Sequence, residues 1–212
     1  MTAATSEEFA QVYWIGGGSG GGKSTIAARL AERFGIALYP TDTTMLTHAE
    51  QSTTEEAPQL ERFKRMSMDE RWLTRDPRDM LESFHWFEGE AFELILRDLR
   101  AYPRSKPVLV EGLRLLPHLV APHLARPTQA LWLLPTPEFR AVAFERRGTL
   151  WDIAGKTSRP PDALRNLFER DAMFTERLQG ELRKLELPSL TVDGQRSFDD
   201  TVDLVAAMLE LS

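Results

Sequence analysis

A glycine-rich segment at residues 16–22 constrains the fold of this chain more than any other feature. It holds six of the thirteen glycines and follows a short apolar run at residues 12–15. After it, apolar residues recur at helical spacing over residues 23–34, as expected for an amphipathic helix. Glycine permits the backbone angles and the close approach that let N–H groups converge on an anion. The pattern therefore predicts a phosphate-binding turn between a strand and a helix.

The turn continues into Lys23 and Ser24 and matches the P-loop motif G-x-x-x-x-G-K-[ST] in full. We expect Lys23 to reach the β- and γ-phosphates of a nucleotide and the Ser24 hydroxyl to ligate Mg²⁺. The dipole of the following helix would add to the attraction. A flexible Gly/Ser linker is the alternative, but the flanking strand and helix argue against it. The predicted nucleotide-binding residues are Gly17, Gly18, Ser19, Gly20, Gly21, Gly22, Lys23, Ser24 and Thr25.

Short apolar runs alternate with longer helical segments along the chain, which favours an α/β fold with a parallel sheet. Strands are predicted at residues 12–15, 36–39, 108–110, 129–134 and 190–192. Helices are predicted at residues 23–34 (capped by Gly35), 76–100, 136–147, 162–185 and from 197 onward. Residues 41–76 are expected to be irregular and residues 148–161 to form a loop.

Composition excludes several classes of protein and site. The chain is 42% hydrophobic and 27% charged, as in ordinary globular proteins. Its formal charge of -6 argues against nucleic acid as the main partner, since neutralising phosphates requires a basic surface. The absence of cysteine excludes disulfides and thiolate metal sites. No secretory signal and no membrane-spanning apolar run is visible, so a cytoplasmic location is expected and no membrane partner.

On these motifs the chain resembles the small P-loop kinases of metabolites and nucleosides, such as shikimate, gluconate and uridine kinases and chloramphenicol phosphotransferase. The resemblance rests on residues 17–25, on Thr41-Asp42, on residues 108–112 and on an arginine-containing segment before the last strand. It implies one three-layer domain over residues 1–212, with a five-stranded parallel sheet in the order 2-3-1-4-5 and helices on both faces. It also implies ATP and Mg²⁺ as cofactors and a short lid at residues 147–161.

Other P-loop classes fit less well. GTPases read guanine with an N-K-x-D motif, and the one asparagine here, Asn166, is followed by leucine. The signature sequence of ABC-type ATPases is missing, and the chain is too short for a typical AAA+ module with its helical lid domain.

Two acids follow predicted strands, at the sheet edge where α/β proteins bind ligands. Asp42 is the candidate general base for the acceptor hydroxyl, although an aspartate after Pro40 also suits an ordinary turn. Glu111, followed by glycine, resembles a second phosphate-site motif with glutamate in place of the usual aspartate; uridine kinases carry a similar pair. It would hold Mg²⁺ through water or share the base role with Asp42. Pairing with a nearby arginine is the structural alternative.

Arginines between residues 140 and 170 are candidates for neutralising charge on the transferred phosphoryl group, as the lid does in the resembled kinases. The set is Arg146, Arg147, Arg159, Arg165 and Arg170. Arg147 and Arg159 are the chosen catalytic candidates, because they flank or lie in the predicted lid loop. Asp171 falls in the apolar stripe of the long helix, so we expect it to pair with an arginine.

The acceptor is expected to bind at residues 43–107, which contain Arg62, Arg65, Arg71 and Arg75 together with Trp72, His85, Trp86 and Phe87. This mixture suits an anionic metabolite, a stacked base or an aromatic antibiotic. Packing against a long helix is the alternative, favoured for Phe84 and Phe87. The turn at residues 193–196 lies where related kinases cover adenine, although a turn needs no such role. The four histidines show no metal-binding spacing.

The predicted function is ATP- and Mg²⁺-dependent transfer of the γ-phosphoryl group to a hydroxyl of a small molecule, a metabolite or an antibiotic. The partners are then a nucleoside triphosphate and that acceptor, and the sequence indicates no particular oligomeric state. Two other functions stay open: a nucleoside or nucleotide kinase, and a non-kinase P-loop ATPase switch that acts through a protein or RNA partner.

Overall fold

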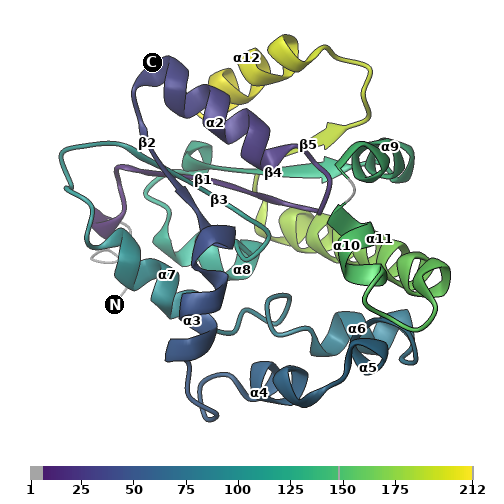
Figure 1. The fold of residues 1–212 in the computed structure, drawn as a ribbon. Coiled ribbons are helices and arrows are strands. Elements are labelled where there is room, and N and C mark those ends of the chain that lie inside the picture. Colours follow the sequence, from purple (N-terminus) through teal and green to yellow (C-terminus); the bar gives the residue numbers. More distant parts are fainter. Residues whose placement is uncertain (1–6, 148, 212) are drawn as a thin grey trace.

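A five-stranded parallel sheet forms the centre of the computed structural model (Figure 1), which describes residues 7–147 and 149–211, with the side chains of residues 146–151 left out of the description. The strands are β1 (Val12–Gly17), β2 (Ala37–Pro40), β3 (Val108–Glu111), β4 (Ala130–Pro135) and β5 (Ser189–Val192). Their spatial order is β2-β3-β1-β4-β5, and each neighbouring pair is parallel. The predicted strands, their order and their direction are therefore confirmed, with boundaries shifted by one or two residues.

Helices cover both faces of the sheet (Figure 1). One face carries α2 (Lys23–Phe34) and α12 (Phe198–Met208), and the other carries α7 (Phe92–Leu99), α8 (Pro117–Val120) and α11 (Pro160–Leu185). Side chains alternate between the two faces along each strand. Ile15 and Leu131 pack with α2 and α12, whereas Trp14 and Trp132 pack with the other three helices. Burial on both faces explains why the three central strands, β1, β3 and β4, read as nearly unbroken apolar runs.

The prediction of one helix over residues 76–100 is wrong. The structure has α6 (Pro77–Ser83) and α7, joined by a turn of residues 84–91. Gly89 and Ala91 have φ values of 81° and 61°, which a continuing right-handed helix does not permit. Within the turn, the Phe87 ring stacks on Phe174 of α11 at 3.7 Å between centroids. Packing of the aromatic residues against α11 therefore overrides the local helical spacing.

Two further expectations need correction. The segment after β2 is not irregular but holds the 3₁₀ helix η1 (Thr41–Thr44) and the short helices α3 (Met45–Gln51), α4 (Pro58–Arg65) and α5 (Met68–Trp72). The predicted loop after α9 (Pro137–Arg147) contains α10 (Thr149–Ala154). Trp72 and Leu73 pack with Phe144, Ala154 and Leu167 in a separate apolar cluster. Helices of one or two turns carry too few residues for a periodic signal.

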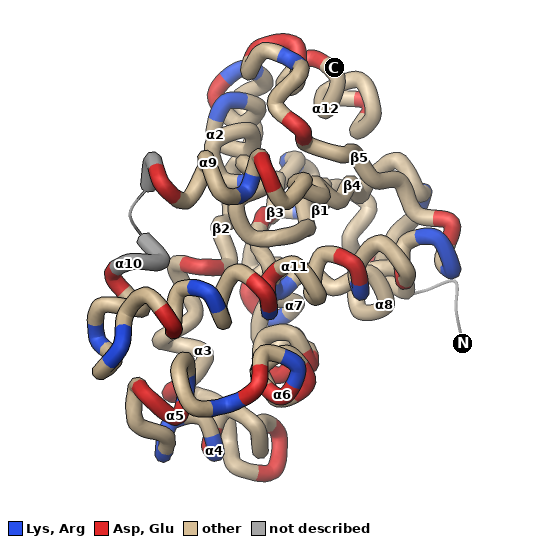
Figure 2. Tube along the Cα trace, turned by 90° about the vertical axis from the view of Figure 1, so that its right-hand side faces the viewer, with Lys and Arg blue, Asp and Glu red and all other residues tan. Residues whose placement is uncertain are grey.

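The surface carries charges of both signs. In Figure 2, basic and acidic residues are interspersed along α11 and along the small helices below it. No helix that the structure describes is both apolar and long enough to cross a bilayer.

The fully buried Gln129, at the end of the 3₁₀ helix η3 (Pro127–Gln129), ties the chain before β1 to the start of β4. Its amide nitrogen lies within hydrogen-bond distance of three backbone carbonyl groups, and its amide oxygen accepts two backbone N–H groups. The five partners are the carbonyl groups of Phe9, Ala10 and Val12 and the N–H groups of Ala125 and Arg126.

Gln129→Ala is expected to lower the free energy of unfolding by about 2–4 kcal/mol, because several buried backbone groups lose their partners at once. Urea denaturation would measure the loss. Gln195→Ala, at an exposed turn, is the control and should change stability by less than about 0.5 kcal/mol. Equal midpoints for the wild type and Gln129→Ala would contradict this reading of the network.

Candidate active site

The glycine-rich turn packs against β4, and this contact requires glycine at position 17, the first residue of the P-loop motif. Gly17 has a φ of 128°, and a Cβ added there would lie 2.1 Å from the carbonyl oxygen of Leu133. The next N–H group, of Gly18, donates to that same oxygen at 3.1 Å. The turn ends at Gly22, the N-cap of α2, again in the left-handed region. The loop is therefore compact and carries almost no side chains.

Lys23 closes the loop. Its Nζ donates to the carbonyl oxygen of Gly18 at 3.0 Å, across the turn. It is the first residue of α2, and the first N–H groups of a helix have no partners within the helix. The helix dipole adds partial positive charge at the same place. This arrangement suits an anion such as a polyphosphate.

A serine hydroxyl and a buried carboxylate meet beside this loop. Ser24 Oγ donates to Glu111 Oε2 at 3.2 Å, and Glu111 is only 2% exposed. Glu111 is the last residue of β3 and pairs in register with Ile15 of β1, which places it beside the start of the loop. Oxygen donors of this kind are the ligands that Mg²⁺ prefers, and Mg²⁺ is usually held by one or two carboxylates together with substrate phosphates. The residues present therefore fit a Mg²⁺ site.

Asp42 lies at the same edge, on the strand next to Glu111. Pro40, at the end of β2, pairs in register with Glu111, and Asp42 follows within η1, its side chain exposed. The two strand ends touch: a Cβ added to Gly112, whose φ is 153°, would lie 1.7 Å from Thr41 Oγ1. The structure thus places both predicted acids on adjacent strand ends. Only a glycine after Glu111 allows that approach.

Arg114, which the sequence analysis did not single out, is buried at this edge, three residues beyond Glu111 and only 2% exposed. Its guanidinium lies 4.3 Å from the centroid of the Trp86 ring. Nη1 lies 3.0 Å from His48 Nδ1, and Nη2 donates to the carbonyl oxygen of Ala91 at 3.0 Å. Burial lowers the pKa of Arg114 to about 10. The sequence signal for this residue was its position just after the strand-end Glu-Gly pair.

A second buried arginine, Arg140 of α9, was also missed and supports the loop from behind. Its Nε donates to the carbonyl oxygen of Ser19 at 3.3 Å, and its Nη2 donates to Thr175 Oγ1 on α11. A Cβ on Gly20 would meet the Arg140 side chain at 3.2 Å. Burial lowers the pKa of Arg140, and the charge of Asp171 partly opposes that effect. Arg140 therefore connects the glycine-rich loop to α11, the helix that follows the predicted lid.

The arginines predicted for the lid do not gather at one place, and those that the structure describes pair with acids of α11. The side chains of Arg146 and Arg147 lie outside the described residues. Arg159 precedes α11, is 66% exposed and pairs with Asp162 at 2.9 Å; Arg165 pairs with the same carboxylate. Arg170 is buried and pairs with Asp171 at 2.6 Å, which confirms the expectation that Asp171 pairs with an arginine.

The arginines predicted for the acceptor region make local contacts. Arg71 donates to the carbonyl oxygens of Phe63 and Lys64, and Arg75 donates to that of Asp79. Arg62 and Arg65 border a surface hollow between α4 and α5. Phe84 and Phe87 pack in or against the core, as the structural alternative predicted.

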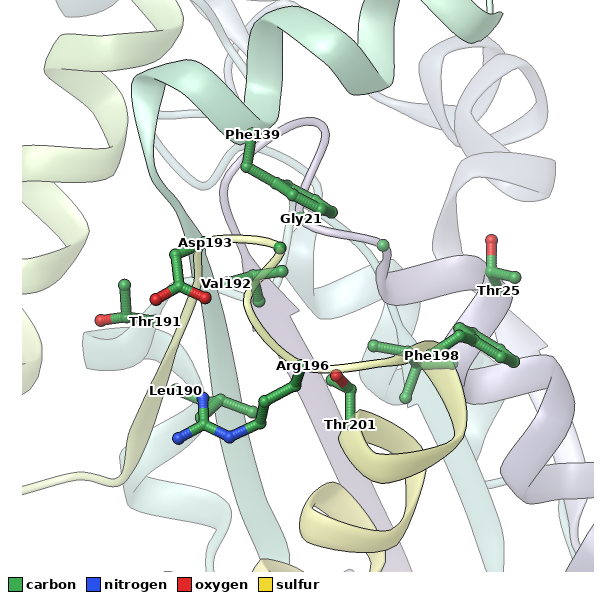
Figure 3. Close-up of a pocket in the computed structure, with 13 residues that line it drawn as sticks. Gly21, Thr25, Phe139, Leu190, Thr191, Val192, Asp193, Arg196, Phe198 and Thr201 are labelled. Atoms are coloured by element: carbon green, nitrogen blue, oxygen red, sulfur yellow. The ribbon is translucent and has the colours of Figure 1, made fainter.

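A pocket of about 380 Å³ lies beside the loop (Figure 3), and this volume is within the usual range for small-molecule sites. The end of β5 and the turn after it line the pocket, together with Phe139 of α9. In Figure 3 the Phe139 ring extends toward Gly21, and Arg196 and Phe198 lie on the opposite side of the pocket from Phe139. The predicted adenine turn therefore borders this pocket. Its lining residues include Gly21, Gly22, Thr25, Phe139, Asp193, Gly194, Arg196, Phe198 and Thr201.

No family model matches the chain, and no curated protein matches it. Among solved structures it is similar to the deoxyadenosine kinase from M. mycoides with bound dATP, with a TM-score of 0.51 and 12% identity over 94% of this chain and 99% of that chain. TT1252 from Thermus thermophilus has a TM-score of 0.49, with 20% identity over 96% and 98%. Shikimate kinase from Acinetobacter baumannii in complex with shikimate has a TM-score of 0.46, with 16% identity over 96% and 93%. The first similarity confirms the predicted α/β fold.

Arg140→Ala is expected to weaken nucleotide binding about tenfold, because losing one charge-assisted bond and its packing leaves the loop less ordered. Titration with a non-hydrolysable ATP analogue would measure the change. Arg183→Ala, an exposed position on α11, is the control. An unchanged dissociation constant in a folded Arg140→Ala protein would rule out support of the loop by this residue.

The buried His85 predicts a pH dependence of stability. Burial, together with the positive charge of Arg114, lowers the pKa of His85 to about 3. In the unfolded chain its pKa is about 6.5, so the unfolded state binds the extra proton between these values. The contribution of neutral His85 to the free energy of unfolding is therefore complete above about pH 6.5. It is lost as the pH falls below that value, by about 1.4 kcal/mol per pH unit. Urea denaturation at pH 7 and pH 5 should give a smaller loss for His85→Gln than for the wild type. Equal losses would contradict the assignment.

Proposed function

We propose that this chain is an ATP- and Mg²⁺-dependent kinase that transfers the γ-phosphoryl group to a hydroxyl of a small molecule. The observation that carries the proposal is the contact between Ser24 Oγ and Glu111 Oε2. It brings a phosphate-loop hydroxyl and a strand-end carboxylate together where the phosphates would lie. Asp42 lies one strand away, so the parts needed to hold nucleotide and acceptor share one sheet edge.

The nucleotide would occupy the loop and the adjoining pocket. The backbone N–H groups of residues 17–25 and the Nζ of Lys23 would hold the phosphates. The base would enter the pocket bordered by Phe139 and the turn at residues 193–196, where an aromatic ring and backbone groups are within reach. Adenine is the base inferred for this pocket.

Ser24 and Glu111 would hold Mg²⁺, which neutralises phosphate charge when bound. The acceptor would lie beside Asp42 and over residues 43–107. In the transfer, the acceptor oxygen forms a bond to the γ-phosphorus and the bond from that phosphorus to the bridging oxygen breaks, so ADP leaves. The hydroxyl proton passes to the carboxylate of Asp42 or of Glu111. Arg147 and Arg159, from the predicted lid, would neutralise the developing charge.

Coupled ADP release with Mg-ATP and a panel of hydroxyl compounds tests the proposal. The panel contains sugars, sugar acids, nucleosides, phosphorylated metabolites and antibiotics. At least one compound is expected to raise turnover well above the background hydrolysis. Lys23→Ala should lower kcat/KM for it by at least about 100-fold, since a preorganised charge on the transition state is lost. Lys106→Ala, which removes an exposed lysine just before β3, is the control.

The outcomes separate the alternatives. A nucleoside or nucleotide as the best acceptor would assign the chain to base-bearing substrates. Slow hydrolysis that depends on Lys23 and that no compound stimulates would favour an ATPase switch acting through a partner. Nucleotide consumption that Lys23→Ala leaves unchanged would contradict the kinase proposal.

A further inference from the structure

Arg114 is a buried cation at the carboxyl edge that lacks a direct counter-ion. Its contacts are a histidine nitrogen, a backbone carbonyl oxygen and the Trp86 ring, and no carboxylate in the described part of the chain forms a salt bridge with it. The negative charges of Asp42 and Asp98 act on it only at longer range. A buried charge without a partner is strongly destabilising, so proteins rarely keep one without a use.

A chain of hydrogen bonds through His48 fixes the orientation of the Arg114 guanidinium. A guanidinium only donates, so His48 Nδ1 must accept from Arg114 Nη1 at 3.0 Å. His48 therefore carries its proton on Nε2 and donates to Asp98 Oδ2 at 2.8 Å, an oxygen that also accepts from Tyr39. The Trp86 ring covers the guanidinium. The orientation of the arginine is therefore fixed by residues of β2, of α3, of the turn at residues 84–91 and of α7.

Three buried polar atoms, one on Arg114 and two on residues that pack against Trp86 or Gly112, have no hydrogen-bond partner among the described residues. They are Arg114 Nε, His85 Nδ1 and Thr41 Oγ1, all buried. His85 packs on Trp86 at 4.4 Å between ring centroids, and Thr41 touches Gly112 between Glu111 and Arg114. Each such unsatisfied buried atom destabilises the fold, and a polar ligand that pairs with it would offset that cost.

We propose that the phosphoryl acceptor carries an oxyanion, a carboxylate or a phosphate, and that Arg114 binds it and selects it over neutral analogues. The inference rests on the proposed function, which places the acceptor beside Asp42 and Glu111. The oxyanion supplies the counter-charge that Arg114 lacks and accepts from its Nε. Arginine suits this role because its planar fork matches both carboxylate and phosphate oxygens.

The test compares matched acceptors in the ADP-release assay: aldonic acids and sugar phosphates against the corresponding neutral sugars and alditols. The anionic member of a pair is expected to be the substrate. Arg114→Gln should raise its KM about 10- to 100-fold and change kcat little, since a charge-assisted hydrogen bond is lost. Arg114→Lys should restore part of the affinity, because it keeps the charge without the fork. Arg126→Gln, at the opposite edge of the sheet, is the matched control.

A neutral acceptor that works as well as its anionic partner would overturn the inference, and so would an Arg114→Gln enzyme with unchanged KM. If Arg114→Gln does not fold, Arg114→Lys carries the same KM comparison. The two types of anion in the panel distinguish a carboxylate from a phosphate.

A binding measurement separates this inference from the kinase proposal. With the P-loop saturated by Mg²⁺ and β,γ-methylene-ATP, the same compounds are titrated calorimetrically into the wild type and Arg114→Lys. If no compound stimulates turnover, binding of an anion that depends on Arg114 would still support the oxyanion site while the kinase proposal fails. Equal binding of anionic and neutral compounds, or none, would overturn the oxyanion site alone.

Discussion

The buried carboxylate of Glu111 is the constraint on which the arrangement of the sheet edge depends. A carboxylate this far from water needs donors around it, and Ser24 supplies one from the phosphate-binding loop. The parallel register then fixes its neighbours, Ile15 on one side and Pro40 on the other. The contact of Gly112 with Thr41 follows from the same approach of strand ends. The glycine-rich loop, the carboxylate of Glu111 and the start of η1 are thus held together by one local geometry.

The layout of the sheet could be predicted because it depends on local patterns. Strands buried on both faces read as apolar runs, and a loop such as residues 16–22 has few other uses between a strand and a helix. The order of the strands came from the resemblance rather than from the runs themselves. Asp171 was predictable for a further reason: a carboxylate within an apolar stripe needs a partner, and Arg170 is adjacent to it.

The features that the sequence did not predict depend on contacts between segments that are distant in the chain. Residues 84–91 keep a spacing of aromatic and apolar residues that also fits a helix, and only the stacking of Phe87 on α11 shows why the chain turns there. Arg114 and Arg140 look like ordinary surface arginines in the sequence. Their burial depends on His48, Trp86 and Thr175, at least 28 residues away in the chain. The roles of Asp42, Glu111, Arg147 and Arg159 remain predictions.

Net charge describes this site poorly. The chain is acidic overall, at -6, yet Lys23, Arg114 and Arg140 are all buried at or behind the carboxyl edge of the sheet. Charges in the interior are screened less by water and salt than those on the surface, so these three cations and the buried carboxylate of Glu111 act more strongly at this point than exposed carboxylates do. Their fields act together on whatever enters the edge. The net negative charge of the chain is therefore no argument against the proposed binding of a polyphosphate, or of a second anion next to it, at this edge.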